Sequence, residues 1–180
     1  MAGFNPSRLK SVLDRHDAKL RIAIETGVFH ASTTRGLSAA FEHVHGIELS
    51  DTYFRIATET CEPFKNITIH HGDSALALPA IAEQFKEPIL FYLDAHWFAH
   101  NQVADSSPFP LWLELAYIKD RPYPDIVIVD DANVFGKALG HVEEWVGLSM
   151  DTITTALGAD TIQDSGIVHD WGVFWRSDRR

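Results

Sequence analysis

The sequence predicts a single-domain α/β protein with a doubly wound, mostly parallel sheet of seven strands and an antiparallel C-terminal hairpin. Short apolar runs alternate about five times with segments of helical periodicity, an order typical of a parallel sheet covered by helices on both faces. Two further β-rich runs follow near the end of the chain, separated only by residues 169–171. So short a separation favours a hairpin.

The expected helices are marked by apolar residues at helical spacing and by capping residues. Asn5 is expected to cap the first helix, with Pro6 at its first position. One of the hydroxyl residues 32–34 is expected to cap the second helix, and Ser50 or Asp51 the third. These helices lie around residues 6–16, 32–41, 51–57, 75–85, 111–119 and 140–150, with an extension of the last toward residue 157 left open.

The expected strands are apolar runs bounded by turn residues. They cover residues 20–24, 44–49, 67–71, 88–94, 125–130, 161–168 and 172–176. No internal repeat or long linker divides the 180 residues, so we expect an N-terminal helix within residues 1–19 and a domain over residues 20–180 that together form one globular unit.

The composition indicates the cellular compartment of the protein and argues against some classes of partner. The only cysteine, Cys61, rules out an internal disulfide and favours a reducing compartment. No apolar run approaches the ~20 residues of a membrane span, and the N-terminus lacks the apolar core of a signal peptide. We therefore expect a cytoplasmic protein with no membrane partner. A formal net charge of −10 argues against nucleic acid as a partner.

Two groups of basic residues are expected outside the core. One is a short basic tail at the C-terminus, interpreted as a solvated end. The other is a set of histidines around the second and third strands that shows no partner pattern and is interpreted as surface or sheet-edge residues. Their members are Arg176, Arg179 and Arg180 in the tail, and His43, His45, His70 and His71 around the strands.

Carboxylates follow several of the expected strands. Glu48, Asp94 and the pair Asp130 and Asp131 each stand where an apolar run ends. In open parallel sheets, ligands bind beyond the carboxyl ends of the strands. Carboxylates gathered there are costly unless they meet a cation, a hydroxyl group or a metal. This pattern indicates a ligand site at that edge of the sheet.

The turn after the first strand favours a nucleoside without phosphates. Gly27 allows close approach of a ligand, but residues 25–34 lack both the glycine cluster and the lysine that hold phosphates. Glu48 stands where an acid bonds ribose hydroxyls in nucleotide-binding βαβ units. The alternative for Gly27 is that it only makes a tight turn. The alternatives for Glu48 and Asp73 are that each only caps the helix that follows it.

Asp94, Asp130 and Asp131 also predict a cation site. If the fourth and fifth strands are neighbours, these side chains converge on one Mg²⁺, which prefers oxygen ligands, and Asn133 adds a carbonyl oxygen. The alternative is that Asp130 and Asp131 cap a turn. His96 is a candidate general base or metal ligand, and the alternative is a hydrogen-bonded histidine at the rim.

In this order, these residues resemble the class I S-adenosylmethionine-dependent methyltransferases. The similarity spans residues 20–176, and it is strongest to a bacterial branch of that family known mainly by its fold. The segments that carry it are Glu-Thr-Gly at 25–27, Ile-Glu-Leu-Ser at 47–50, Gly-Asp-Ser at 72–74, Leu-Asp-Ala-His at 93–96 and Asp-Asp-Ala at 130–132. The resemblance implies the Rossmann-like methyltransferase fold.

The resemblance also implies a role for each cofactor-binding residue. Glu25 and Gly27 correspond to the acid and glycine that hold the methionine part of S-adenosylmethionine. Glu48 corresponds to the acid on the ribose, and Asp73 with Ser74 to the residues near the adenine. This chain differs from the family in its first turn, which usually has two or three glycines.

Within the family, the acid after the fourth strand faces the reacting centre, which implies that role for Asp94. Together with Asp130 and Asp131 it resembles the metal site of the metal-dependent O-methyltransferases. We therefore expect Mg²⁺-assisted methylation of an oxygen on a small-molecule acceptor, with Asp94 and His96 as catalytic residues. A homodimer partner or the loop 98–110 is expected to complete the acceptor pocket.

Two alternatives of other classes remain open from the sequence. The same fold and metal ligands suit a metal-dependent hydrolase or hydroxylase that uses no methyl donor. A non-catalytic ligand-binding protein on a degenerate methyltransferase fold is also compatible with these residues.

Overall fold

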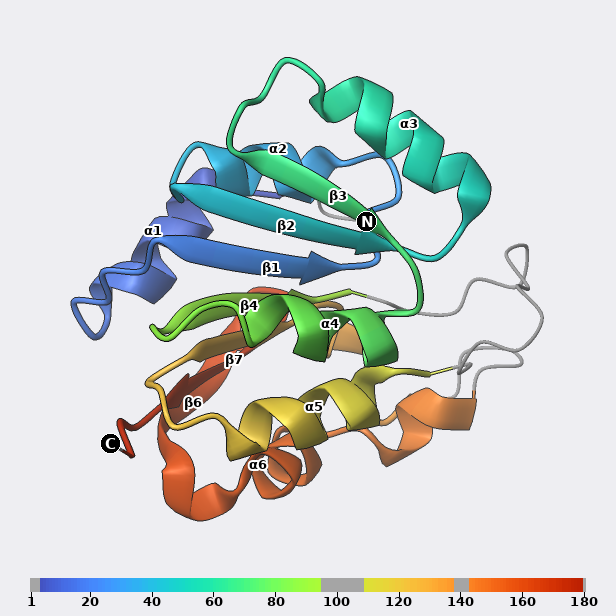
Figure 1. Cartoon of the computed structure of the whole chain (residues 1–180). Coiled ribbons are helices and arrows are strands. Elements are labelled where there is room, and N and C mark those ends of the chain that lie inside the picture. Colours follow the sequence, from blue (N-terminus) through green and yellow to red (C-terminus); the bar gives the residue numbers. More distant parts are fainter. Residues whose placement is uncertain (1–3, 95–108, 138–142, 180) are drawn as a thin grey trace.

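The computed structural model describes residues 4–94, 109–137 and 143–179. Its seven strands form one sheet in the order β3-β2-β1-β4-β5-β7-β6 (Figure 1). The strands are β1 (Ile22–Thr26), β2 (His43–Glu48), β3 (Ile67–His71), β4 (Ile89–Leu93), β5 (Ile126–Val129), β6 (Ile162–Val168) and β7 (Trp171–Arg176). Strands β1 to β5 pair in parallel, and β7 is antiparallel to both β5 and β6, so the predicted fold class is confirmed.

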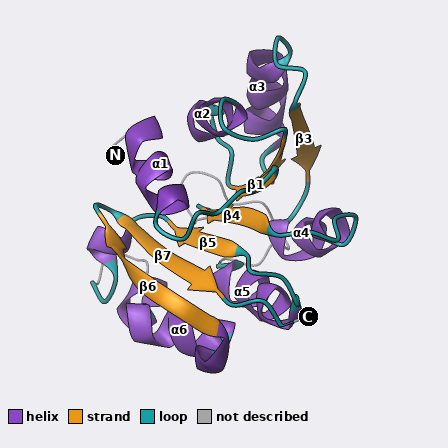
Figure 2. Cartoon of the chain, turned by 90° about the vertical axis from the view of Figure 1, so that its left-hand side faces the viewer, coloured by secondary structure: helices purple, strands orange, loops and turns teal. Residues whose placement is uncertain are grey.

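Helices cover both faces of the sheet (Figure 2). The helices are α1 (Pro6–Asp14), α2 (Ser32–Ser38), α3 (Asp51–Cys61), α4 (Ser74–Ala82), α5 (Leu111–Asp120) and α6 (Met150–Leu157). One core layer lies between the sheet and α4, α5 and α6, and the opposite face packs against α1, α2 and α3. In the described part of the chain, no helix combines the length and the apolar character that crossing a membrane requires.

Helix α1 is built as its sequence predicts. The Asn5 side chain accepts a hydrogen bond from the Ser7 N–H at 2.9 Å, and Pro6 opens the helix. Leu9 and Val12 are buried against the sheet, each contributing roughly 1.5–3 kcal/mol of apolar burial. The indole of Trp175 on β7 donates to the Val12 carbonyl at 3.1 Å, which ties the helix to the sheet.

The end of the first strand and the cap of the second helix differ from the prediction, and both lie next to the predicted ligand site. Strand β1 continues through Glu25 and Thr26, so the acid lies within the strand and not beyond it. Helix α2 has Ala31 at its N-cap and no side-chain cap. The predicted hydroxyl cap is therefore wrong, and Thr34 instead donates its hydroxyl to Glu25.

The segment before the hairpin is not one helix. Within its described part, residues 143–147 form a short 3-10 helix and α6 begins separately at Met150. Ser149 separates them by a capping box: its Oγ accepts from the Thr152 N–H at 3.1 Å, and the Thr152 Oγ1 accepts from the Ser149 N–H at 2.9 Å. The predicted β6–β7 hairpin is confirmed, with Trp171 as the first residue of β7.

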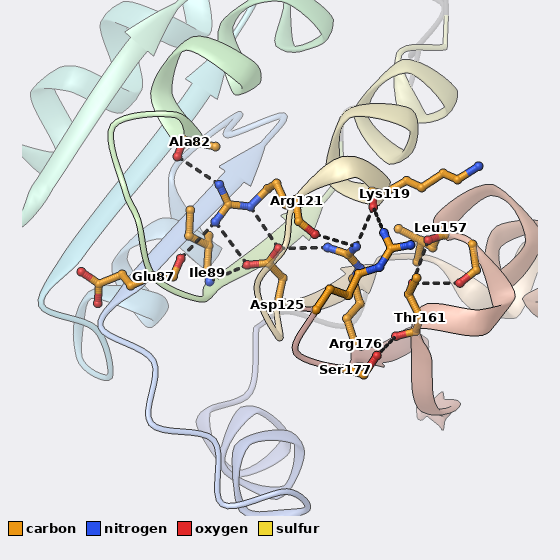
Figure 3. A network of polar contacts seen from close by, with 12 residues as sticks. Ala82, Glu87, Ile89, Lys119, Arg121, Asp125, Leu157, Thr161, Arg176 and Ser177 are labelled. Atoms are coloured by element: carbon orange, nitrogen blue, oxygen red, sulfur yellow. Dashed lines mark hydrogen bonds and ion pairs between the residues drawn. The ribbon is translucent and has the colours of Figure 1, made fainter.

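Arg176 is buried, so its interpretation as part of a solvated tail is wrong. Its side chain is fully enclosed and donates to the buried Asp125 carboxylate at 3.1 Å (Figure 3). Arg121 donates to the same carboxylate at 3.0 Å, and the Ile89 N–H donates to it at 2.9 Å. This network joins α5, β4, β5 and β7 at the amino ends of the parallel strands, opposite the predicted ligand site.

The histidines of β2 and β3 include a partnered pair, contrary to the sequence interpretation. The His45 Nδ1 and His70 Nε2 atoms lie 3.0 Å apart, and Phe85 packs against His45. Burial, reinforced by His70 and His43, lowers the pKa of His45 to about 4, and burial also lowers the pKa of His70. Both rings are therefore neutral near pH 7 and stabilise the pairing of β2 with β3.

Candidate functional site

The carboxyl ends of the parallel strands meet at one edge of the sheet. Backbone hydrogen bonds continue past the strand ends: Asp94 N–H donates to the Thr26 carbonyl at 3.1 Å, and Asp130 N–H to the Leu93 carbonyl at 3.1 Å. On the other side of β1, Gly27 N–H donates to the Ile47 carbonyl at 2.9 Å. The sheet thus aligns the segments that follow β1, β2, β4 and β5, as the sequence predicts.

The turn after β1 has an alternating left-handed backbone. Gly27, Phe29 and Ala31 have φ angles of 77°, 51° and 58°. Glycine adopts this conformation freely, whereas a side chain makes it unfavourable. The chain therefore keeps a glycine-like turn with only one glycine at these three positions.

Glu25 is buried beneath this turn, with 1% of its surface exposed. The Thr34 hydroxyl of α2 donates to its Oε2 at 2.5 Å. Burial raises the pKa of Glu25 well above its usual value, the Thr34 hydrogen bond partly opposes this, and the charges of Asp94 and Asp130 add to the rise. Glu25 thus anchors α2 while contributing to a shared acidic environment.

Glu48, at the end of β2, connects two loops. Its Oε2 accepts from the Phe29 N–H and its Oε1 from the Ser50 N–H, both at 2.8 Å. Ser50 supplies the cap of α3, because its Oγ accepts from the Tyr53 N–H at 3.5 Å. Glu48 is therefore not the capping residue, and its carboxylate is held between the first turn and the start of α3.

Asp73 and Ser74 lie where β3 leads into α4. The Asp73 side chain accepts from the Ala75 N–H at 2.9 Å, which confirms its capping role. Ser74 is buried. Their predicted place near an adenine stays a prediction, and the backbone bond from Gly72 to the Glu48 carbonyl at 3.0 Å keeps this loop next to Glu48.

Asp130 is tied to the strand beside it. The Tyr92 hydroxyl of β4 donates to its Oδ2 and the Asp131 N–H to its Oδ1, both at 2.8 Å. Burial, followed by the charge of Asp94, raises the pKa of Asp130 to about 6. Burial also raises the pKa of Tyr92, so this hydroxyl stays protonated and acts as a donor.

The described residues do not form the predicted metal site. Among them, no group of three His, Cys, Asp or Glu side chains is arranged to hold a metal ion. Asp131 has a left-handed φ of 55° at the start of a short 3-10 helix (Ala132–Val134), and both oxygens of Asp130 already accept hydrogen bonds. His96 and most of the loop 98–110 lie outside the described residues.

Sequence reasoning missed three residues at this edge. Thr34 bonds Glu25, Tyr92 bonds Asp130, and Thr26 has a fully buried Oγ1 with no hydrogen-bond partner among the described residues. Strand alternation offers a signal for Tyr92, which lies two residues before Asp94 and therefore on the same face of β4. No comparable pattern marks Thr34.

The chain is similar in structure to several solved proteins. No protein-family model and no curated protein sequence matches the chain. Among solved structures, a Streptococcus mutans protein described as a methyltransferase, in complex with SAH, matches with a TM-score of 0.62 and 15% identity over 96% of this chain and 95% of that chain. A Klebsiella pneumoniae protein described as an O-methyltransferase matches with a TM-score of 0.58 and 14% identity over 99% and 82%.

Fibrillarin from Aeropyrum pernix, solved with natively bound S-adenosyl-L-methionine, matches with a TM-score of 0.55 and 12% identity over 94% of this chain and 74% of that chain. At such identities the likeness establishes architecture and leaves the chemistry to the site. The strand order, the antiparallel β7 and these matches lead to one conclusion: the chain has the fold of the class I S-adenosylmethionine-dependent methyltransferases.

Proposed function

We propose that this protein binds S-adenosylmethionine at the carboxyl edge of its sheet and transfers the methyl group to an oxygen of a small-molecule acceptor. The observation that carries the proposal is the acidic environment shared by Glu25, Asp94 and Asp130: the charge of Asp94 adds to burial in raising the pKa of both Glu25 and Asp130. Solved proteins of this fold hold S-adenosylmethionine or SAH.

The charge of this edge suits a cationic ligand. S-adenosylmethionine carries a sulfonium and an ammonium group, and carboxylates stabilise positive charge strongly where water is excluded. In the described structure, Glu25 and Asp130 accept hydrogen bonds from neutral groups only. A bound cation would therefore favour the ionised forms of both carboxyl groups.

Hydrogen-bonding capacity supports the same ligand. Each oxygen of the Glu48 carboxylate has two lone pairs, and each accepts one backbone N–H, so acceptor capacity remains for two ribose hydroxyls. Among the described residues, the buried Thr26 Oγ1 beside Gly27 has no hydrogen-bond partner, so this hydroxyl keeps its hydrogen-bonding capacity. We assign Glu25 and Gly27 to the methionine part, Glu48 to the ribose, and Asp73 with Ser74 to the adenine.

When bound, S-adenosylmethionine supplies a methyl group on a positively charged sulfur. The chain's contribution is alignment: Asp94 would orient the ligand where β1 and β4 end, so that an acceptor oxygen lies in line with the methyl carbon and the departing sulfur. The acceptor hydroxyl must lose a proton as the new bond forms. We assign to His96 the role of the general base that accepts this proton.

The sequence also predicts that Mg²⁺ assists the reaction. The described side chains, however, do not form a preformed metal site. The proposed reaction therefore does not require a bound metal ion. Methyl transfer that survives EDTA would agree with this reaction. Transfer that is abolished by EDTA and restored by Mg²⁺ would instead reinstate a site at Asp94, Asp130 and Asp131.

A labelled-methyl assay tests the proposed function. The protein is incubated with methyl-labelled S-adenosylmethionine and a panel of catechols, phenols and aliphatic alcohols, with and without EDTA. We expect transfer to at least one class, and Asp94→Asn should lower it by about 10²-fold. Glu59→Gln, on an exposed position of α3, should leave it unchanged. Binding of S-adenosylmethionine without transfer to any acceptor would contradict the enzymatic proposal.

A further inference from the structure

The turn after β1 contains a side chain in an unfavourable backbone conformation. Phe29 has a φ of 51°, and 43% of its surface is exposed. A large side chain in this region is uncommon and persists only where its surroundings fix it. The conformation matters because the Phe29 N–H donates to the Glu48 Oε2 at 2.8 Å.

Two aromatic rings hold Phe29 in place. The Phe29 ring centroid lies 4.3 Å from that of Tyr53 and 4.1 Å from that of His30, and the His30 and Tyr53 centroids are 5.4 Å apart. The free energy that such ring contacts contribute is of the same order as the free-energy cost of a left-handed backbone at a non-glycine residue. We call Phe29, His30 and Tyr53 the aromatic clamp.

The aromatic clamp joins the turn to α3. Tyr53 lies in the first turn of α3, and its N–H donates to the Ser50 side chain that caps the helix. The Ser50 N–H donates to Glu48, whose other oxygen accepts from Phe29. The turn, the Glu48 carboxylate and the start of α3 therefore form one connected unit.

We propose that Tyr53 is a positioning residue: through its contact with Phe29 it fixes the first turn, which lacks two glycines, in the conformation that presents Glu48 and the turn backbone to a ligand. The chain thus replaces the freedom of glycine with a side-chain contact. The inference about the turn stands on these contacts alone, and only its effect on ligand affinity rests on the proposed function.

Four proteins test the proposal: wild type, Tyr53→Ala, Tyr53→Phe, and the double variant Tyr53→Ala with Phe29→Gly. Phe54→Ala is the matched control, because Phe54 on the same helix stacks on His71 and not on the turn. Amide hydrogen exchange at residue 29, measured without ligand, reports the turn. Calorimetric titration with SAH reports its consequence for binding.

We expect Tyr53→Ala to speed exchange at residue 29 and weaken SAH binding, each about tenfold, since losing the contact leaves the backbone cost uncompensated. Tyr53→Phe should stay within about twofold of wild type because it keeps the ring. In the double variant Phe29→Gly should restore both readouts, because glycine adopts the left-handed backbone freely.

Unchanged exchange at residue 29 in Tyr53→Ala, or a double variant no better than Tyr53→Ala, would overturn the proposal. If Phe54→Ala speeds exchange at residue 29 as much as Tyr53→Ala does, the effect is a general loss of helix stability and the proposal also fails. If wild type binds no SAH, the proposed function fails, while the exchange measurements still decide the role of Tyr53.

Discussion

Asp130 lies where the polar edge of the sheet meets its core. Both of its oxygens accept hydrogen bonds, and burial followed by the charge of Asp94 raises its pKa from 3.8 to about 6. The folded protein therefore holds this proton more tightly than the unfolded chain does. The stability that the protonated group contributes is complete below the unfolded pKa and is lost as the pH rises from about 4 to about 6.

Replacing Asp130 with asparagine should remove this pH dependence. At pH 7 the ionised carboxylate costs the folded protein on the order of 1–3 kcal/mol after allowance for solvent screening. Asp130→Asn should therefore raise the free energy of unfolding, relative to wild type, by more at pH 7 than at pH 4. Urea denaturation at both pH values, in EDTA, measures the difference. An equal effect at the two pH values would contradict the assigned environment of Asp130.

At the scale of elements, β2 supports the first turn by close packing. Gly46 on β2 pairs with Glu25 of β1, and a Cβ atom at residue 46 would lie 2.6 Å from the Val28 Cγ2 and 3.1 Å from the Ile69 Cδ1. Val28 belongs to the turn that presents the predicted ligand contacts. The conformation of the turn therefore depends on the absence of a side chain on the neighbouring strand.

Gly46→Ala should displace Val28 and with it the turn. We expect a loss of about 1–3 kcal/mol in the free energy of unfolding, as is usual when a packed core receives an extra methyl group. SAH binding should weaken as well. Gly147→Ala is the control, because a Cβ atom there meets nothing within 4 Å. Denaturation and calorimetry measure both effects, and a Gly46→Ala protein as stable as wild type would contradict the packing described here.

The buried network at the opposite edge affects stability and not the site. Asp125 lies between the guanidinium groups of Arg121 and Arg176, so Asp125→Ala leaves two buried cations without a counter-charge. We expect a loss of about 3–5 kcal/mol in unfolding free energy. Asp120→Ala, at an exposed position of α5, should cost far less. Thermal denaturation compares the two, and equal melting temperatures would contradict the role of the network.

The elements themselves were largely predictable because their signals are local. Apolar runs, helical spacing and the caps Asn5, Ser50 and Asp73 located strands and helices correctly. Two local predictions were wrong, the hydroxyl cap of α2 and the single helix before the hairpin. The other errors concern contacts between residues distant in sequence. Arg176 reaches Asp125 across 51 positions, and His45 reaches His70 across 25, so nothing in the local pattern of either residue marks its partner.

At the scale of the whole molecule, the sheet order determines which carboxylates share an environment. The prediction that β4 and β5 are neighbours is confirmed, and it places Asp94 and Asp130 at adjacent strand ends. The aromatic clamp had no sequence signal, because Phe29 and Tyr53 belong to different loop–helix units that only the β1–β2 pairing brings together. Topology was therefore more predictable than the side-chain contacts that complete the site.

Calorimetric titration of the protein with SAH tests the central claim, a nucleoside-type ligand at the carboxyl edge, most directly. We expect saturable binding of one SAH per chain with a micromolar dissociation constant. Glu48→Gln should weaken it roughly tenfold or more, because hydrogen bonds to a charged acceptor are lost. Glu59→Gln should bind as wild type does. Absence of heat at millimolar SAH, or equal affinity in Glu48→Gln, would contradict the claim.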